Sequence, residues 1–302
     1  MSDPAVAAFA AEHPELTVRE RWLDAGGVRL HLVEAGPPDG PPVLLFHGFP
    51  EFWWGWRRQL PALAAAGFRV VAPDLPGYNL SDKPRRLGAY RLDRLAELVP
   101  ALADDLGAAA LPLVGHDWGG ALAWWSALCH PERISRLAIL NAPHPSVLRR
   151  ALRSSPQQRK RNVYMLYFQL PWLPERKLAA GGYRPLRSML RRTSRPGTFD
   201  EAELERYAQA AGRPGALGGM LAWYRAALRR PAPRPPHARV EPETLILWGA
   251  EDVALGRELV APSAERCRSA EVVWFESAGH WLQHEEADEV NRRLLAFLAP
   301  NR

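Results

Sequence analysis

The stretch LPLVGHDWGGALAWWSALC, residues 111–129, passes from an apolar strand pattern through a tight turn into a helical pattern. Gly115, Gly119 and Gly120 permit a sharp turn, since they carry no side chain that would collide with the strand or the helix. This is the setting of the nucleophile elbow G-x-S-x-G, with Asp117 in the serine position and a helix N-terminus beside it. The stretch predicts an α/β fold in which Asp117 is the nucleophile, although an aspartate here can also simply cap the helix.

An aspartate nucleophile limits the chemistry. A serine that attacks a saturated carbon forms an ether, which water does not cleave, whereas a carboxylate forms an ester, which water does cleave. Asp117 therefore suits substrates whose electrophile is an sp³ carbon, such as an epoxide or an alkyl halide. Esterase, lipase and peptidase functions are disfavoured. The reaction needs neither a metal ion nor an organic cofactor, and we expect none.

Short apolar runs alternate with helical patterns on both sides of this stretch. Because strands buried on both faces are apolar throughout, we expect a mostly parallel central sheet flanked by helices. Before the first parallel strand, residues 19–36 predict a hairpin that turns at Gly26 and Gly27. The expected strands are 43–46, 69–72, 111–114, 137–140, 244–248 and 271–275, and the expected helices include 91–106 and 119–129.

The alternation stops between Pro143 and about Pro236, where prolines interrupt helical patterns and no strand pattern occurs. We expect a core formed by residues 1–143 and 237–302, with a helical lid inserted at 144–236. The lid is strongly basic. Residues 146–199 carry 13 Lys and Arg against one acid, a net +12, whereas the rest of the chain carries −6.

The catalytic partners of Asp117 are expected in a fixed order, because this fold places the nucleophile first, the acid second and the histidine last. His280 follows the last expected strand and precedes the final helix. The loop after strand 244–248 offers Glu251 and Asp252. We favour Asp252, since its shorter side chain suits a fixed hydrogen bond to His280, and Glu251 is the alternative.

The motif His47-Gly48-Phe49-Pro50 follows the strand at 43–46. The N–H groups of Phe49 and Trp118 are the expected oxyanion donors for the tetrahedral intermediate of ester hydrolysis. The bond between Phe49 and Pro50 is a candidate for the cis form.

Several motifs together resemble the epoxide hydrolase branch of the α/β-hydrolase superfamily, over nearly the whole chain. Asn79 is a departure, because relatives more often carry glycine or another small residue there, and we expect it on a surface turn. The motifs are HGFPEFWWGWR at 47–57, DLPGYNLSDKP at 74–84, GHDWGG at 115–120, LNAPHP at 140–145, YMLYFQLPW at 164–172, WYR at 223–225, LWGAEDVAL at 247–255 and GHWLQ at 279–283.

The resemblance implies the α/β-hydrolase fold and hydrolysis of an epoxide to a vicinal diol through an ester on Asp117. It also implies two lid tyrosines that hydrogen-bond the epoxide oxygen, and their motifs match Tyr164 and Tyr224. An opening epoxide releases an alkoxide, which needs an acid. A haloalkane or haloacid dehalogenase is the alternative on the same scaffold, but a halide leaves without a proton. A ligand receptor without activity is a third possibility, although no triad member is missing.

We expect a small apolar epoxide as the substrate, because the lid and the helix after Asp117 are rich in aromatic residues. The predicted pocket residues are His47, Pro50, Trp118, Phe168 and Trp281. Further aromatic candidates for the pocket are Tyr167, Trp172, Tyr183, Trp223, Trp124 and Trp125.

The composition of the 302 residues, 47% hydrophobic and 24% charged, is that of a globular protein. No apolar run reaches the roughly 20 residues of a membrane span, and the N-terminus lacks the pattern of a secretory signal. Two cysteines without a CxxC pairing disfavour a disulfide framework and a zinc site, and we expect a cytoplasmic protein, monomeric or homodimeric. The basic segment matches no nucleic-acid-binding module. Its charge reflects either solvated arginines or a weak contact with anionic amphiphiles or membranes.

Overall fold

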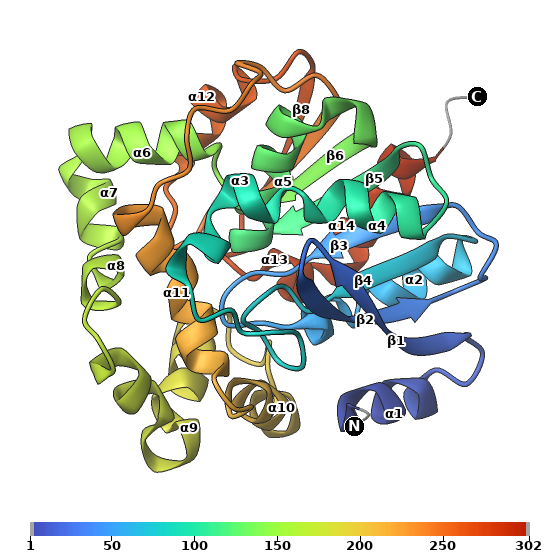
Figure 1. Ribbon diagram of the computed structural model, residues 1–302, viewed down its shortest axis with the longest axis horizontal. Helices are drawn as coiled ribbons and strands as arrows, with labels where there is room; N and C mark the ends of the chain where they lie inside the picture. The colour runs from blue at the N-terminus through green and yellow to red at the C-terminus, as the bar shows by residue number, and fades with distance from the viewer. Residues whose placement is uncertain (1–2, 300–302) are drawn as a thin grey trace.

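The computed structural model describes residues 3–299, which form one eight-stranded sheet of order β1-β2-β4-β3-β5-β6-β7-β8 with surrounding helices (Figure 1). β2 runs antiparallel to β1 and β4, and all other pairings are parallel. The mostly parallel sheet is thus confirmed, with strand ends that differ by at most three residues from those expected. The strands are β1 Val18–Ala25, β2 Val28–Ala35, β3 Pro42–Phe46, β4 Arg69–Pro73, β5 Leu111–His116, β6 Ile134–Leu140, β7 Glu243–Gly249 and β8 Ala270–Phe275.

Helices fill most of the connections between these strands. α9 consists of two helical pieces, because residues 180–183 have non-helical backbone angles. The α-helices within residues 3–299 are α1 Pro4–Glu12, α2 Gln59–Ala65, α3 Leu92–Leu95, α4 Leu98–Asp105, α5 Trp118–Cys129, α6 Pro145–Ser154, α7 Pro156–Arg161, α8 Tyr164–Tyr167, α9 Leu173–Thr193, α10 Glu201–Ala211, α11 Ala216–Arg229, α12 Val260–Ala264, α13 Leu282–Glu285 and α14 Ala287–Leu298.

The antiparallel edge of the sheet is the predicted hairpin. Ala25 of β1 pairs with Val28 of β2, so the turn consists of Gly26 and Gly27 alone. Both have positive φ, +59° and +81°, which a two-residue hairpin turn of this kind requires and which glycine adopts without strain.

The expected single helix over residues 91–106 is instead the pair α3 and α4. Pro100 is the physical reason. Its nitrogen has no hydrogen to donate to the Ala96 carbonyl, and its ring collides with that carbonyl in a continuous helix. In the first turn of a new helix the missing N–H costs nothing, so α4 begins at Leu98 and includes Pro100.

Asn79 was expected on a surface turn, and this expectation is wrong. Its side chain is only 1% exposed, and its amide donates hydrogen bonds of 2.8 Å to both Asp3 and Asp74. Its φ of +35° explains why a glycine is suitable at this position, and asparagine tolerates such backbone angles better than most residues. Asp3 also caps α1, a helix that the sequence patterns did not predict.

Helices α6 to α11 are consecutive between β6 and β7, and within them no strand is described. We call residues 145–229 the helical insertion. α6 to α9 form the left edge of the molecule in Figure 1, away from the hairpin and the N-terminus. The insertion is bound to the core through Tyr207 of α10, whose hydroxyl donates to Glu51, and through Thr193 of α9, which accepts from Trp281.

The parallel strands β3, β5, β6, β7 and β8 all end at the same edge of the sheet. Their following loops begin with His47, Asp117, Asn141, Ala250 and Glu276. Ligands bind at this carboxyl edge in open α/β sheets. Among residues 3–299, no helix combines the length and the apolar character that crossing a membrane would need.

The turn between β5 and α5 requires glycine at 119, since a Cβ there would lie 2.1 Å from the carbonyl oxygen of Phe46. We predict that Gly119→Ala lowers the free energy of unfolding by about 1–3 kcal/mol, because backbone rather than a movable side chain opposes it. In Gly218→Ala, on α11, the new Cβ meets nothing within 4 Å, and we expect a gain of about 0.5–1 kcal/mol. Urea denaturation followed by circular dichroism measures both. Equal effects at the two positions would contradict the proposed contact.

Candidate active site

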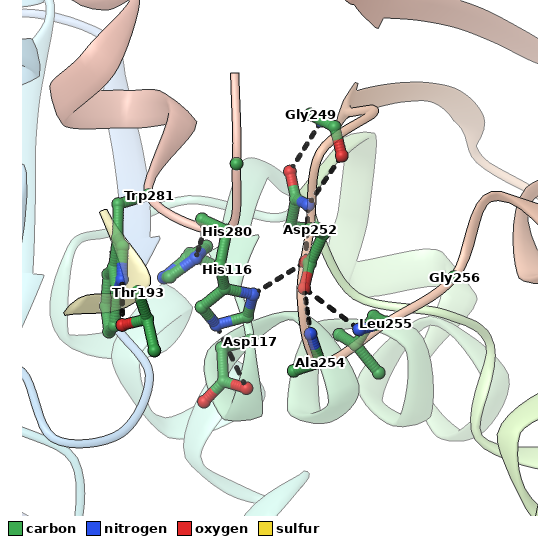
Figure 2. A network of polar contacts seen from close by, with 12 residues as sticks. His116, Asp117, Thr193, Gly249, Asp252, Ala254, Leu255, Gly256, His280 and Trp281 are labelled. Carbon is green, nitrogen blue, oxygen red and sulfur yellow. Dashed lines mark hydrogen bonds and ion pairs between the residues drawn. The ribbon is translucent and has the colours of Figure 1, made fainter. Parts of the chain in front are cut away.

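Asp117 lies at the tip of the turn between β5 and α5 with φ +50° and ψ −117°, a conformation that is strained for any residue except glycine. The turn presents its carboxylate to the loops around it. Oδ1 accepts the backbone N–H of Phe49 at 2.8 Å, and Oδ2 lies 3.7 Å from Nε2 of His280. The two oxygens are therefore in different environments, since Oδ1 is held by a donor and Oδ2 faces the histidine. Figure 2 shows Asp117 and His280 facing each other.

His280 and Asp252 form the closest ionisable pair at Asp117. His280 Nδ1 lies 2.7 Å from Oδ2 of Asp252, while the other carboxylate oxygen accepts the N–H groups of Ala254 and Leu255 at 2.7 and 2.9 Å (Figure 2). Asp252 is buried, and Glu251 is exposed to solvent. The geometry therefore pairs His280 with Asp252, the favoured of the two carboxylates.

Asn141, for which no role was predicted, holds Asp252 in place. Its amide donates to Oδ2 of Asp252 at 2.6 Å, and its own oxygen accepts the N–H of Gly249 at 2.9 Å. It thus joins the loop after β6 to the loop after β7. The signal that points to Asn141 is its place directly after β6, at the edge where the catalytic loops meet.

The surroundings of His280 favour its protonated form. Burial alone would lower its pKa, but the carboxylates of Asp252 and Asp117 outweigh burial and raise the pKa to about 9. The same attraction keeps the pKa of Asp252 below its usual value despite burial. At neutral pH the resting site thus contains an imidazolium between two carboxylates. Neutralising Asp117 removes one of them and lowers the pKa of His280.

Two tyrosines of the helical insertion come together above Asp117. The ring of Tyr224, on α11, lies edge-on to Trp118 and Phe49 with centroid distances of 5.0 and 5.3 Å. The ring of Tyr164, on α8, lies 6.0 Å from that of Tyr224. Burial, with Asp117 nearby, raises the pKa of both hydroxyls, so both remain protonated and can donate hydrogen bonds at neutral pH.

Side-chain amides anchor the segment before Tyr164 to the loop that carries Asp252. Gln158 and Asn162 both donate to the carbonyl of Ala254, at 2.8 and 3.1 Å. Ala254 N–H in turn donates to Asp252, so the position of Tyr164 is linked to that of the buried carboxylate.

The other predicted pocket residues contact either the catalytic side chains or the backbone of the loop after β3. Phe168 packs against Phe49 with a centroid distance of 5.6 Å, and Trp281 packs against His280 at 4.9 Å. His47 bonds through both ring nitrogens to backbone, to Gly48 O and to Leu75 N, so it stabilises the loop. The bond before Pro50 is cis, as considered from the sequence.

Trp172 does not line the pocket, contrary to expectation, because its side chain is 61% exposed. It precedes the first turn of α9 with φ +51°, and the guanidinium of Arg176 lies over its ring at 5.9 Å. The helix start thus directs this aromatic ring towards solvent. Trp124 was also a candidate, and its indole is buried and donates to the carbonyl of Ala142.

A buried polar network joins the site to α10, and its members were not assigned roles from the sequence. Glu51 accepts hydrogen bonds from His284 at 2.7 Å, from Tyr207 at 3.0 Å and from Gln283 at 3.1 Å. Tyr207 is therefore a buried hydrogen-bond donor. Burial and the neighbouring Arg57 lower the pKa of His284 to about 4, so this imidazole is neutral.

His116, directly before Asp117, connects this network to the catalytic loop. Its Nε2 donates to the carbonyl of His280 at 2.9 Å, and its Nδ1 lies 3.1 Å from the amide of Gln283. The histidine therefore couples the elbow to the loop after β8.

One group of three side chains within residues 3–299 has the spacing of a metal site, namely Asp3, His31 and Asp74, whose ligand atoms lie within 4.8 Å of one another. Protein donors already occupy these atoms. His31 lies 2.7 Å from Asp74, and Asp3 and Asp74 both accept from Asn79. An ion would have to displace these bonds, so the cluster fits a structural role.

The chain is similar to known proteins over most of its length. Residues 41–287 match the model of the α/β-hydrolase fold family. The chain is 38% identical over 281 residues to the AB hydrolase superfamily protein YfhM of Bacillus subtilis, covering 93% of this chain and 98% of that protein. It is 34% identical to human epoxide hydrolase 4, covering 96% of this chain and 83% of that protein. The crystal structure of Bacillus megaterium epoxide hydrolase in complex with an inhibitor superposes with a TM-score of 0.83 at 30% identity, covering 92% of this chain and 99% of that one.

The two carboxylates beside His280 raise its pKa, and this effect can be measured by titration. We predict that the imidazole NMR signals of His280 titrate with a pKa near 9, and that Asp117→Asn lowers this pKa because one of the two negative charges is lost. A His280→Gln spectrum identifies the signals. A pKa that is the same in wild type and in Asp117→Asn would contradict the electrostatic coupling.

Proposed function

Because the chain belongs to the α/β-hydrolase fold family and to its epoxide hydrolase branch, we propose that it converts an apolar epoxide to a vicinal diol. The observation that carries the proposal is the environment of Asp117 Oδ2. It faces His280 at 3.7 Å, while two protonated tyrosines lie above it on the helical insertion. A nucleophile, a base and two acids thus lie close together.

In the first step, Oδ2 of Asp117 forms a bond to an epoxide carbon as the carbon–oxygen bond of the ring breaks. The electron pair goes to the epoxide oxygen, which takes a proton from Tyr164 or Tyr224. The product is a hydroxyalkyl ester of Asp117. Oδ1 becomes the ester carbonyl oxygen and remains bound to the N–H of Phe49.

Ester formation changes the state of His280. Asp117 loses its negative charge, so the pKa of His280 falls and the imidazolium releases its proton. This proton goes to the tyrosinate left by the first step and restores its hydroxyl group. His280 is then the neutral base that the second step needs, still oriented by Asp252 at 2.7 Å.

In the second step, His280 takes a proton from water as the water oxygen attacks the ester carbon. Negative charge develops on Oδ1, where the N–H groups of Phe49 and Trp118 stabilise it. When the intermediate collapses, the bond from the ester carbon to the alkoxy oxygen breaks. The alkoxide takes the proton of the newly added hydroxyl group and leaves as the diol, and Asp117 returns to the carboxylate. The imidazolium and the carboxylate of the resting enzyme are restored.

A dehalogenase on the same scaffold is not favoured. Its leaving halide needs no proton, so it would have no use for the buried hydroxyls of Tyr164 and Tyr224. The named relatives support the epoxide reaction as well.

The proposal gives the helical insertion the role of a lid, within the predicted range 144–236. It also includes a cytoplasmic location, which fits the two free cysteines, Cys129 and Cys267. The net +12 charge of residues 146–199 supports an attraction for anionic amphiphiles.

We predict that His280→Gln accumulates the ester, since attack by Asp117 needs no base but hydrolysis does. Intact-protein mass spectrometry after mixing with styrene oxide then shows an increase equal to the mass of the epoxide. The double variant with Asp117→Asn is the control and shows no increase. Diol formation by His280→Gln at the wild-type rate would mean that another group activates the water.

We predict that Tyr164→Phe and Tyr224→Phe each reduce kcat/KM for styrene oxide by about 10- to 1000-fold, because each removes one acid. Tyr167→Phe is the matched control. Tyr167 lies three residues after Tyr164, and its ring faces Lys177 at 5.6 Å. A loss for Tyr167→Phe as large as that for Tyr164→Phe would argue against proton donation.

A further inference from the structure

The segment around α8 is apolar on two sides, although only one side is buried. Tyr164 and Phe168 point inwards and pack against Tyr224 with centroid distances of 6.0 and 5.0 Å. A helix that is apolar all round is normally buried in a core. Here the other apolar side is exposed to solvent.

The exposed side is formed by α8 and the turns next to it. Val163 precedes α8, Leu166 lies in it and Leu170 follows it, and their exposed fractions are 61%, 63% and 44%. Trp172 and Leu173 continue the surface with 61% and 41% exposure. These five residues are the outer apolar face.

The backbone of Trp172 has an unusual conformation. A tryptophan with φ +51° is in the left-handed region that bulky residues rarely adopt, so this ring is held outwards at a cost in backbone energy. The Arg176 guanidinium lies over the ring at 5.9 Å, but 61% of the side chain stays exposed, and an apolar phase would cover that exposed surface.

Basic side chains flank the outer apolar face on both sides in sequence. Arg159 and Lys160 precede it on α7, and Arg176 and Lys177 follow it on α9, all of them exposed. Glu175 does not offset them, because its carboxylate is paired with Arg225 at 2.6 Å. In Figure 1 these helices lie along the outer left edge of the molecule.

We infer that the outer apolar face and its basic flanks dock on the surface of an anionic lipid bilayer. Leucine and tryptophan side chains on one face, flanked by arginine and lysine, are the combination that binds in the headgroup region without spanning the membrane. A second copy of this chain is a poorer occupant, since pairing would bring two strongly basic surfaces together.

The biological role of this docking rests on the proposed function. If the substrate is an apolar epoxide, docking provides a route by which the substrate reaches the active site. An apolar epoxide dissolves in the acyl chains of a bilayer. Docking through the outer apolar face places the segment that carries Tyr164 between the lipid and Asp117. The enzyme would then draw its substrate from the membrane surface.

Flotation of the whole protein with vesicles tests the docking without using catalysis. We expect binding to vesicles of phosphatidylglycerol and phosphatidylcholine, much weaker binding to phosphatidylcholine alone, and loss of binding as salt rises. Replacing Leu166 and Leu170 together with serine, or Trp172 with serine, should reduce binding at least 10-fold. Arg176→Gln and Lys177→Gln should each reduce it about fivefold.

Matched variants elsewhere on the surface are the controls. Trp274, 36% exposed with Arg257 over its ring at 4.7 Å, is a second exposed tryptophan beside an arginine, and Trp274→Ser should bind like wild type. Arg19 and Arg94 are exposed and lie outside the helical insertion. Arg19→Gln and Arg94→Gln each remove one positive charge, as Arg176→Gln does, and should bind like wild type.

All of these variants should turn over a water-soluble epoxide like the wild type. The docking proposal is overturned if wild type fails to float with anionic vesicles, or if Trp274→Ser loses as much binding as Trp172→Ser. A wild-type dimer that Leu166→Ser converts to a monomer would assign the face to a second copy instead. Docking with no diol formation from any epoxide would leave the surface intact and reject the proposed function.

Discussion

Asp117 is held in a backbone conformation with positive φ that is strained for any residue except glycine, and the catalytic geometry depends on that constraint. Three close approaches enforce it. A Cβ on Gly48 would lie 2.4 Å from the Cβ of Asp117, one on Gly119 would lie 2.1 Å from the Phe46 carbonyl, and one on Gly115 would lie 2.5 Å from the Gly119 carbonyl. The strand end, the elbow and the loop after β3 are thus in contact through backbone. This contact brings the Phe49 N–H to Oδ1 and leaves Oδ2 free to react.

The electrostatics of the site follow from having two carboxylates and one imidazole in a buried space. His280 lowers the pKa of Asp252 most, and the N–H of Leu255 and the amide of Asn141, which do not change during a reaction, lower it further. The charge on Asp117 does change, because esterification removes it. His280 therefore gains acidity when the ester forms and regains basicity when the carboxylate returns. One residue serves both states because its pKa depends on the charge of its neighbour.

Local patterns in the sequence were sufficient for the strands, the elbow and the hairpin, since apolar runs and paired glycines determine such elements over a few residues. Features that depend on distant partners were not predictable in this way. Asn79 is buried because Asp3, far away in the chain, accepts its amide. Trp172 looked like a pocket aromatic by composition, but the start of α9 directs it to solvent. Asn141 carries no charge, so its importance appears only when Asp252 lies beside it.

The inner side of the helical insertion is held by hydrogen bonds, whereas its outer apolar face is exposed to solvent. Gln158 and Asn162 anchor the segment before Tyr164 to Ala254, and Gln169 donates to the carbonyl of Tyr224 at 3.1 Å. The segment before α8 is therefore tied to the Asp252 loop, and the residue after Phe168 is tied to the backbone of Tyr224. The outer apolar face takes no part in these bonds. A surface that covers the outer side can thus bind the insertion without moving the proton donors away from Asp117.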